Sequence, residues 1–208
     1  GCPLDAIPEH AARLDAVMLR GVADGAALAG VLEDGRINAL CLGPGMGVSA
    51  REAGLVGVAL GAGEGGQIAH PTRFLVLDAD ALNAVAADPM LMQALQARGR
   101  RGQPTVLTPH PLEAARLAGL ETSTVQANRL AVAQQLADQF GAVLVLKGSG
   151  TVVAAPGELP ALNPSGNARL ATAGTGDVLA GWLGGLWTQQ AEGPNSARAV
   201  ARAAVWLH

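Results

Sequence analysis

The sequence predicts an α/β domain built on a mainly parallel central sheet with helices on both faces. Four short apolar runs alternate with segments of helical pattern, and strands that are apolar throughout are typical of sheets buried on both sides. These runs lie at residues 37–42, 74–77, 105–107 and 142–146. With 208 residues, half of them apolar, the chain is expected to form one domain over residues 1–208.

The first two runs end in residues that suit a binding site. A glycine loop, Gly43-Pro44-Gly45-Met46-Gly47, follows the first run and precedes a helix expected from about Ser49 to Leu60. Asp78 and Asp80 follow the second run. These carboxylates are either a metal pair or caps of a helix that starts near Ala81.

The third and fourth runs end in the same way. Thr108-Pro109-His110-Pro111 follows the third, and Lys147-Gly148-Ser149-Gly150-Thr151 follows the fourth, before a hairpin strand expected at residues 151–155. An ordinary loop histidine and an ordinary hairpin turn are the simpler interpretations. In parallel sheets, however, ligands collect beyond the carboxyl ends of the strands, where Lys147 would be a point charge near phosphates.

Three helices are expected in the second half of the chain. The first runs from Ser123 to Phe140, because Ser123 and Gln126 have capping-box spacing and an apolar stripe follows. That stripe consists of Val125, Val132, Leu136 and Phe140. Two helices rich in Ala, Leu and Trp are expected at residues 175–189 and 196–208.

The stretch from Asn163 to Asp177 is predicted to be a loop that leads into a helix. The glycines of Gly174-Thr175-Gly176 free the backbone, so that consecutive N–H groups can converge on an anion at the start of that helix. A carboxylate in the same turn is unfavourable beside a phosphate unless a proton or a metal lies between them, which suggests chemistry on the phosphate. Phosphoryl transfer accommodates both features, since the N–H groups stabilise the moving phosphoryl charge and Asp177 accepts the proton of the attacking hydroxyl. The simpler interpretation of Asp177 is a carboxylate favoured by the helix dipole.

Composition disfavours several other classes of protein. A net charge of -3 and a pI near 5.8 give no footprint for nucleic acid, and the absence of a signal peptide or a long apolar stretch disfavours export and membrane insertion. Two cysteines without metal or disulfide spacing are compatible with a reducing cytosol, and Cys41 is expected to pack in the core. Residues 61–66 match G-x-G-x-x-G but follow a helix, so they are interpreted as a helix-ending loop rather than a dinucleotide site.

Taken together, these segments resemble the ADP/ATP-dependent NAD(P)H-hydrate dehydratases of the ribokinase-like superfamily. The match runs from about Ile37 to the end of the chain. The Gly174–Asp177 turn is shared across the superfamily, whereas its combination with Thr-Pro-His-Pro and Gly-Pro-Gly is more specific. The matching segments, in the family's order, are residues 42–47, 77–82, 107–111, 146–151 and 163–181.

The resemblance implies a three-layer α/β/α fold and a cytoplasmic repair enzyme that restores NADH and NADPH from their hydrates, NADHX and NADPHX. It implies that Asp177 is the catalytic base, that ADP or ATP is the phosphoryl donor, that Mg²⁺ is used, and that the protein is a homo-oligomer with a fused or separate NAD(P)H-hydrate epimerase. The implied nucleotide contacts are Lys147, Gly148, Ser149, Gly150, Thr151 and Gly176. The implied hydrate contacts are Gly45, Gly47, His110 and Asp177.

Two departures from the family pattern leave alternatives open. Leu112 follows Pro111 where the family usually has glycine, and the family's first strand-helix-strand region is not found before Gly1. We therefore expect a domain truncated at its amino end, with an exposed sheet edge. The alternatives are a small-alcohol kinase of the hydroxymethylpyrimidine or hydroxyethylthiazole type, and a nucleotide-binding module without catalysis.

Overall fold

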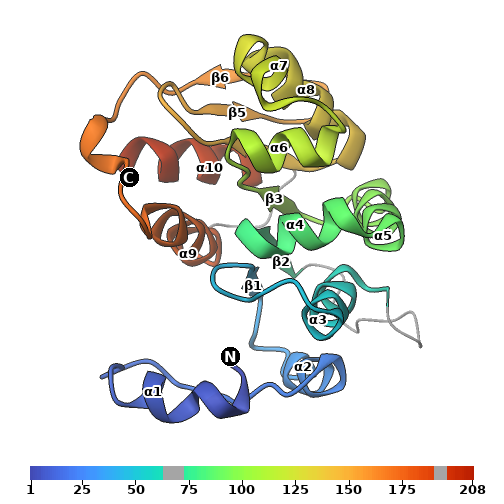
Figure 1. Ribbon diagram of the computed structural model, residues 1–208, viewed down its shortest axis with the longest axis vertical. Coiled ribbons are helices and arrows are strands. Elements are labelled where there is room, and N and C mark those ends of the chain that lie inside the picture. Colours follow the sequence, from blue (N-terminus) through green and yellow to red (C-terminus); the bar gives the residue numbers. More distant parts are fainter. Residues whose placement is uncertain (63–72, 190–195) are drawn as a thin grey trace.

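The computed structural model describes residues 1–62, 73–189 and 196–208, and its centre is a six-stranded sheet (Figure 1). The spatial order of the strands equals their order in the chain, with β1 to β4 parallel and β5 and β6 antiparallel. The strands are β1 (Ala39–Leu42), β2 (Phe74–Leu77), β3 (Thr105–Leu107), β4 (Val143–Leu146), β5 (Val152–Ala154) and β6 (Ala161–Leu162). The four predicted parallel strands and the hairpin strand are confirmed.

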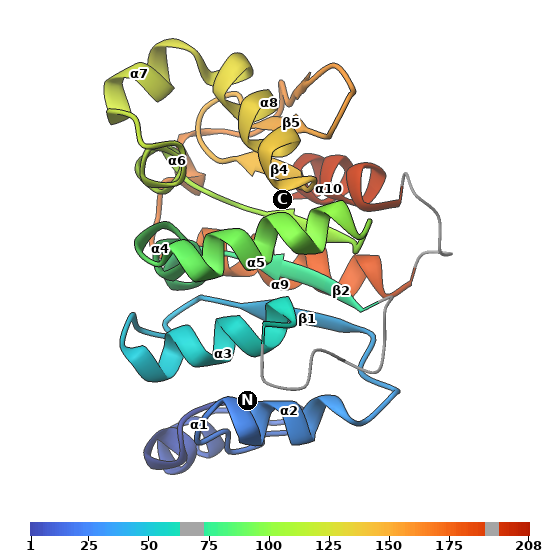
Figure 2. The ribbon, with the colours of Figure 1, turned by 90° about the vertical axis from the view of Figure 1, so that its right-hand side faces the viewer.

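Helices cover both faces of the sheet, which makes the three layers that the sequence predicts. Figure 2 shows α3, α4 and α5 on one side of β1 and β2, with α9 on the other. The first layer consists of α3 (Ala50–Leu60), α4 (Ala79–Ala87), α5 (Pro89–Arg100), α6 (Pro111–Ala118), α7 (Thr122–Ala127) and α8 (Arg129–Phe140). The second consists of α9 (Thr175–Trp187) and α10 (Ser196–Leu207).

The sheet separates two apolar cores, and β2 contributes to both. Leu75 and Leu77 pack in the core beneath α3 to α8, while Phe74 and Val76 pack in the core beneath α9 and α10. All four side chains are buried. Because a strand covered on both faces has no polar side, its sequence is continuously apolar, which is the pattern that predicted a parallel sheet.

The segment before β1 forms short helices that the sequence analysis did not predict. These are η1 (Leu4–Ala6), α1 (Ile7–Ala11) and α2 (Gly25–Leu32). Leu28 and Leu32 of α2 pack with Leu55 of α3 in a small third cluster. β1 ends the strand order and is only partly buried, and Cys41 on it is exposed rather than in the core. The expectation that Cys41 packs in the core was therefore wrong, since an end strand is not covered as the central ones are.

The predicted helix from Ser123 to Phe140 is two helices. It breaks at Asn128 (φ −130°, ψ 39°), and α7 has no side-chain cap, so the capping box predicted at Ser123 is wrong. The apolar stripe was predicted correctly, because tertiary burial selects it whether or not the helix is continuous. Gly61 ends α3 in the left-handed conformation, and residues 63–66 of the predicted helix-ending loop lie outside the described residues.

A close approach between α5 and the end of α8 makes Gly99 sensitive to substitution. A Cβ on Gly99 would lie 2.0 Å from the carbonyl oxygen of Phe140. We expect Gly99→Ala to lower the free energy of unfolding by about 3 kcal/mol, because backbone atoms must move to admit the methyl group. Urea denaturation measures this change.

The matched control is Gly30→Ala in α2, where no atom lies within 4 Å of the added Cβ. This variant should gain about 0.5 to 1 kcal/mol from the better helix propensity of alanine. A Gly99→Ala protein as stable as the Gly30→Ala protein would contradict the close packing of α5 on α8.

Candidate active site

The four parallel strands place their carboxyl ends along one edge of the sheet, and the pairing continues past the strands. Three backbone hydrogen bonds of 2.9 to 3.0 Å join neighbouring loops there, so these loops lie side by side. The bonds run from the N–H of Asp78 to Leu42, from Thr108 to Leu77, and from Lys147 to Pro109. All the loops that the sequence analysis singled out after strands therefore meet at one edge.

A buried ion pair lies at the centre of this edge. The Nζ of Lys147, after β4, lies 2.6 Å from Oδ1 of Asp78, after β2. The Asp78 side chain is 1% exposed, and its Oδ2 accepts no hydrogen bond in the part of the chain that the structure describes. Glu113 Oε2 lies 3.9 Å from the same Nζ. Two buried carboxylates thus face one lysine, which leaves an excess of negative charge at this point.

Asp78 and Asp80 have different partners. The residue between them, Ala79, has a φ of 47°, and this strained turn directs the two side chains apart. Asp80 accepts the N–H of Gly47 at 2.8 Å, so it holds the glycine loop after β1. Asp78 makes no helix-capping bond. The side chains therefore show neither a capping role for Asp78 nor a pairing of both carboxylates on one metal.

The glycine loop after β1 rests directly on the backbone of Asp78. A Cβ on Gly43 (φ 128°) would lie 1.6 Å from the carbonyl oxygen of Asp78, so no other residue fits there. Gly45 and Gly47, further along the loop, are exposed. This contact brings the predicted hydrate-binding glycines within reach of the ion pair.

His110 caps α6, and it forms a capping box with Glu113. Its Nδ1 accepts the N–H groups of Leu112 and Glu113 at 3.1 and 3.3 Å, and Glu113 Oε2 accepts the N–H of His110 at 2.7 Å. Since Nδ1 is an acceptor, the neutral ring carries its proton on Nε2, which lies 3.2 Å from Glu113 Oε1. The histidine side chain is 45% exposed, so its outer edge can meet a ligand.

The first turn of α9 lies close to the ion pair. Gly174 is its N-cap, in the left-handed conformation and without a side-chain cap, so the N–H groups of the first turn lack intrahelical partners. A Cβ on Gly176 would lie 3.3 Å from Lys147 Nζ and 3.9 Å from Asp78 Oδ2. Asp177, the next residue, is exposed.

A cavity of about 620 Å³ opens beside this turn. Its walls are Lys147–Thr151, the segment from Leu162 to Ala168, Thr175 and Gly176, with Val205 and His208 from the end of the chain. All six predicted nucleotide contacts line it, whereas Asp177, His110, Gly45 and Gly47 do not. The volume lies in the range of small-molecule and cofactor sites.

The pKa of Cys41, near the end of β1, responds to the charged groups at this edge of the sheet. Although the residue is exposed, loss of solvation raises the pKa of its thiol to about 11, and the carboxylates of Asp78 and Asp177 raise it further in the same direction. Both carboxylates therefore act on one point beside β1. The lone thiol stays protonated, and so unreactive, at neutral pH.

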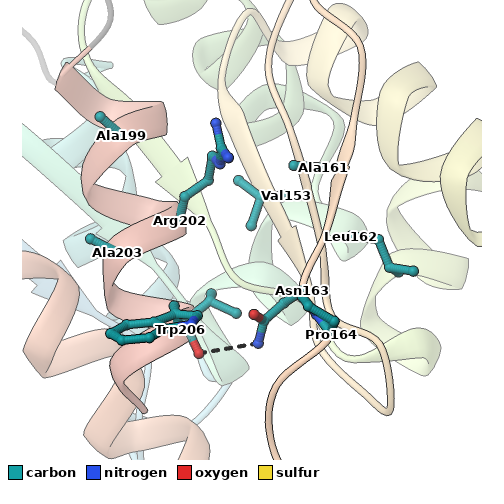
Figure 3. A pocket seen from close by; sticks show the side chains of 10 residues that line it. Val153, Ala161, Leu162, Asn163, Pro164, Ala199, Arg202, Ala203 and Trp206 are labelled. Carbon is teal, nitrogen blue, oxygen red and sulfur yellow. Dashed lines mark hydrogen bonds between the residues drawn. The ribbon is translucent and has the colours of Figure 1, made fainter.

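A second hollow of about 410 Å³ lies between α10 and the outer strands β5 and β6 (Figure 3). Asn163 lines both hollows. Its Nδ2 donates a hydrogen bond to the carbonyl of Val205 at 3.3 Å. This bond fixes the start of the Asn163–Asp177 stretch against α10. The side chain therefore sets the position of one cavity wall.

Two further properties concern metals and membranes. Within residues 1–62, 73–189 and 196–208, no three His, Cys, Asp or Glu side chains form a group that could hold a metal ion by themselves. Among these same residues, no helix has the length and apolar character needed to cross a membrane.

Sequence reasoning missed the role of Glu113 and of Arg129. Glu113 stands three residues after His110, which is capping-box spacing, but histidine is not a usual N-cap residue and the signal was not read. Arg129 begins α8 and contacts the Lys147–Thr151 loop. No local sequence pattern predicts this contact, because it depends on how α8 packs against β4 and β5.

Comparison with known proteins adds a family to this geometry. A family model described as NAD(P)H-hydrate dehydratase matches residues 1–208. An ADP-dependent (S)-NAD(P)H-hydrate dehydratase of Neisseria meningitidis is 44% identical over 163 residues, which cover 75% of this chain and 52% of that protein. A bifunctional NAD(P)H-hydrate repair enzyme of Mycobacterium leprae is 41% identical over 152 residues, which cover 73% of this chain and 28% of that protein.

A crystal structure shares the fold. The ADP/ATP-dependent NAD(P)H-hydrate dehydratase from Bacillus subtilis, co-crystallized with ATP/Mg²⁺, has a TM-score of 0.64 and 34% identity, over 82% of this chain and 53% of that chain. The ribokinase-like fold class is thereby confirmed. The chain spans about half or less of the length of these relatives.

The ion pair between Lys147 and Asp78 is expected to be coupled strongly. Lys147→Met leaves a buried charge on Asp78, so we expect the free energy of unfolding to fall by about 3 to 5 kcal/mol. Asp78→Asn in the same chain should restore much of that loss, and urea denaturation of the singles and the double variant measures the coupling. The control is the exposed pair Arg13–Glu9, whose cycle should give less than about 0.5 kcal/mol. Additive effects of Lys147→Met and Asp78→Asn would contradict a buried pair.

The thiol of Cys41 offers a test of where Asp177 lies. Because the pKa is raised to about 11, alkylation of Cys41 by iodoacetamide in a Cys2→Ser background should be slow at pH 8 and rise steeply above pH 10. Asp177→Asn removes one negative charge and should speed the reaction at pH 9. Asp138→Asn, on α8, should leave the rate unchanged. Equal rates in the Asp177→Asn and Asp138→Asn proteins would show that Asp177 does not face Cys41.

Proposed function

Because the chain belongs to the NAD(P)H-hydrate dehydratase family, we propose that it dehydrates NADHX and NADPHX to NADH and NADPH at the expense of ADP or ATP. In this reaction the nucleotide phosphorylates the ring hydroxyl of the hydrate, and the phosphate then leaves to restore the reduced ring. The single observation that carries the proposal is the placement of Gly176. It lines the cavity together with Lys147, a Cβ on it would lie 3.3 Å from Lys147 Nζ, and Asp177 is next to it in the chain.

The nucleotide belongs in the cavity. Gly148, Ser149 and Gly150 donate none of their N–H groups to acceptors among the described residues, and these residues line the cavity. At the start of α9, Thr175 and Gly176 also line the cavity, and we propose that the first-turn N–H groups of Gly174, Thr175 and Gly176 form an anion hole there. Lys147 adds a positive charge between the two sets, and Thr151 completes the wall. This combination suits the phosphates of ADP or ATP.

The hydrate belongs on the other side of the α9 turn, toward β1 and α6. Gly45 and Gly47 lie on the loop held by Asp80, and the outer edge of His110 is exposed. These groups border the same strand ends as the ion pair but lie outside the nucleotide cavity. The two ligands would therefore meet at the first turn of α9.

We assign the role of base between the two ligands to Asp177, because it is exposed and directly follows Gly176. Its carboxylate takes the proton of the attacking hydroxyl while the oxygen–phosphorus bond forms and the bond to the leaving nucleotide breaks. The N–H groups of the Gly174–Gly176 turn stabilise the charge on the transferring phosphoryl group. A strong base is not required, since positioning and charge stabilisation dominate a loose transition state.

The residues of the site fit Mg²⁺. Among the described residues, Asp78 Oδ2 is buried without a partner and Glu113 lies near the same lysine, so two carboxylates share one positive charge there. Mg²⁺ is typically held by one or two carboxylates together with substrate phosphates and water. Asp78 and Glu113 would hold it, and it would supply charge neutralisation on the phosphates.

Further properties of the family extend the proposal. They are a preference for either ADP or ATP, a cytoplasmic location, a homo-oligomeric state, and cooperation with an NAD(P)H-hydrate epimerase, either fused or separate. We also propose that residues 1–208 form a single dehydratase domain.

Incubation of the protein with NADHX, Mg²⁺ and ADP or ATP tests the proposal directly. Restored absorbance of reduced nicotinamide, with release of inorganic phosphate, is the expected result. Phosphorylation of hydroxyethylthiazole or hydroxymethylpyrimidine without action on NADHX would favour a small-alcohol kinase. Thermal stabilisation by ADP without turnover of either substrate would favour a nucleotide-binding module.

Asp177→Asn is expected to lower kcat by at least about a hundredfold, because the amide cannot accept the hydroxyl proton. The Kd for ADP, measured by calorimetry, should change less than threefold, since Asp177 does not line the cavity. Asp24→Asn is the control: it removes a carboxylate at the start of α2 but keeps a good cap, so it should be fully active. Unchanged turnover in Asp177→Asn would exclude Asp177 as the base.

A further inference from the structure

We propose that Arg129 is a positioning residue for phosphate binding, because it holds the carbonyls of the Lys147–Thr151 loop on one side so that the N–H groups face the cavity. The inference rests on the proposed function. It concerns a residue on α8 that lines no part of the cavity itself. Its effect on a ligand must therefore pass through the loop.

The guanidinium of Arg129 binds three backbone carbonyls of one turn. Its Nη2 donates to Leu146 and Gly150 at 3.2 Å and to Lys147 at 3.4 Å, and Nη1 also reaches Lys147 at 3.5 Å. A fork of N–H donors fixed in one plane can satisfy several acceptors at once, which a lysine ammonium cannot do with the same geometry. The turn is thus held from behind at both of its ends.

Gly148 fits this arrangement and no larger residue does. A Cβ on Gly148 (φ 138°) would lie 3.0 Å from Nη1 and 3.2 Å from Nη2 of Arg129. The guanidinium therefore lies where a side chain at position 148 would need space. The glycine and the arginine form one unit, in which the backbone crosses directly over the cation.

This arrangement determines which way the peptide groups point. In a trans peptide the carbonyl of one residue points away from the N–H of the next, so the Lys147 and Gly150 carbonyls that face Arg129 turn the N–H groups of Gly148 and Thr151 to the opposite side. The N–H of Gly148 has no acceptor among the described residues. Hydrogen bonds to a cation also polarise the peptide groups, so their N–H groups become better donors. Both effects favour an anion in the cavity.

The charge of Arg129 is not used in an ion pair. The salt bridges within the described ranges do not include it, and Gln126 Oε1, at 3.2 Å, is its one side-chain acceptor there. Carbonyl dipoles alone balance the guanidinium, so a positive charge remains behind the loop. A nucleotide phosphate on the far side of the loop would be attracted by it.

Arg98 provides a matched control at the opposite end of the sheet. It too binds backbone carbonyls, those of Arg73 at 2.7 Å and Pro104 at 3.2 Å, and it is buried. Loss of its side chain should therefore cost stability in a similar way. It lies at the amino ends of β2 and β3, far from the phosphate loop.

The experiment compares Arg129→Lys, Arg129→Met and Arg98→Met with the unaltered protein. We expect the Kd for ADP, by calorimetry at a temperature where every variant is folded, to rise about tenfold in Arg129→Met and about threefold in Arg129→Lys. The KM for the nucleotide should rise in parallel while kcat changes less than twofold. Arg98→Met should lower the unfolding temperature and leave both constants unchanged.

Two results would overturn the role of Arg129. One is a folded Arg129→Met protein that binds ADP as tightly as the unaltered one. The other is an Arg98→Met protein that loses as much ADP affinity as Arg129→Met, which would reduce the effect to general destabilisation. An unaltered protein that binds neither ADP nor ATP would instead overturn the proposed function, and the role of Arg129 with it.

Discussion

The ion pair between Lys147 and Asp78 is the constraint on which the site depends. It joins the ends of β4 and β2, which are separated by β3, so it forms only when the sheet has its full parallel register. A buried carboxylate must find a partner, and Lys147 is the ordered cation that reaches it. The position of the lysine then sets how closely Gly176 can approach, and both residues line the cavity.

Other contacts extend this constraint to every loop at the edge. Glu113 links the pair to His110, and Asp80 links the neighbouring strand end to Gly47. Arg129 holds the lysine loop from the opposite side. Three acidic residues and one arginine therefore position groups that the sequence analysis had identified singly. Neighbouring loops at this edge are therefore bonded to one another as well as to their own strands.

Much of the fold was predictable because burial on both faces leaves a simple pattern. The four parallel strands and the helices that cover them follow from continuous apolar runs and from stripes such as that on α8. Helix ends were less predictable. The break at Asn128 and the histidine cap at His110 depend on hydrogen bonds that several residue types can make, so local preference did not select them.

By itself, the sequence determined the fold class, the strand ends that meet at one edge, and the glycine loops that follow them. These features can be predicted from the sequence, because hydrophobic pattern and backbone freedom are local properties. Only the tertiary structure decided the partners of the charged groups. Asp78, for which the sequence suggested a helix cap or a metal pair, forms half of a buried ion pair. Arg129 binds a loop eighteen residues away. Such pairings depend on distances across the sheet, which the order of residues along the chain does not contain.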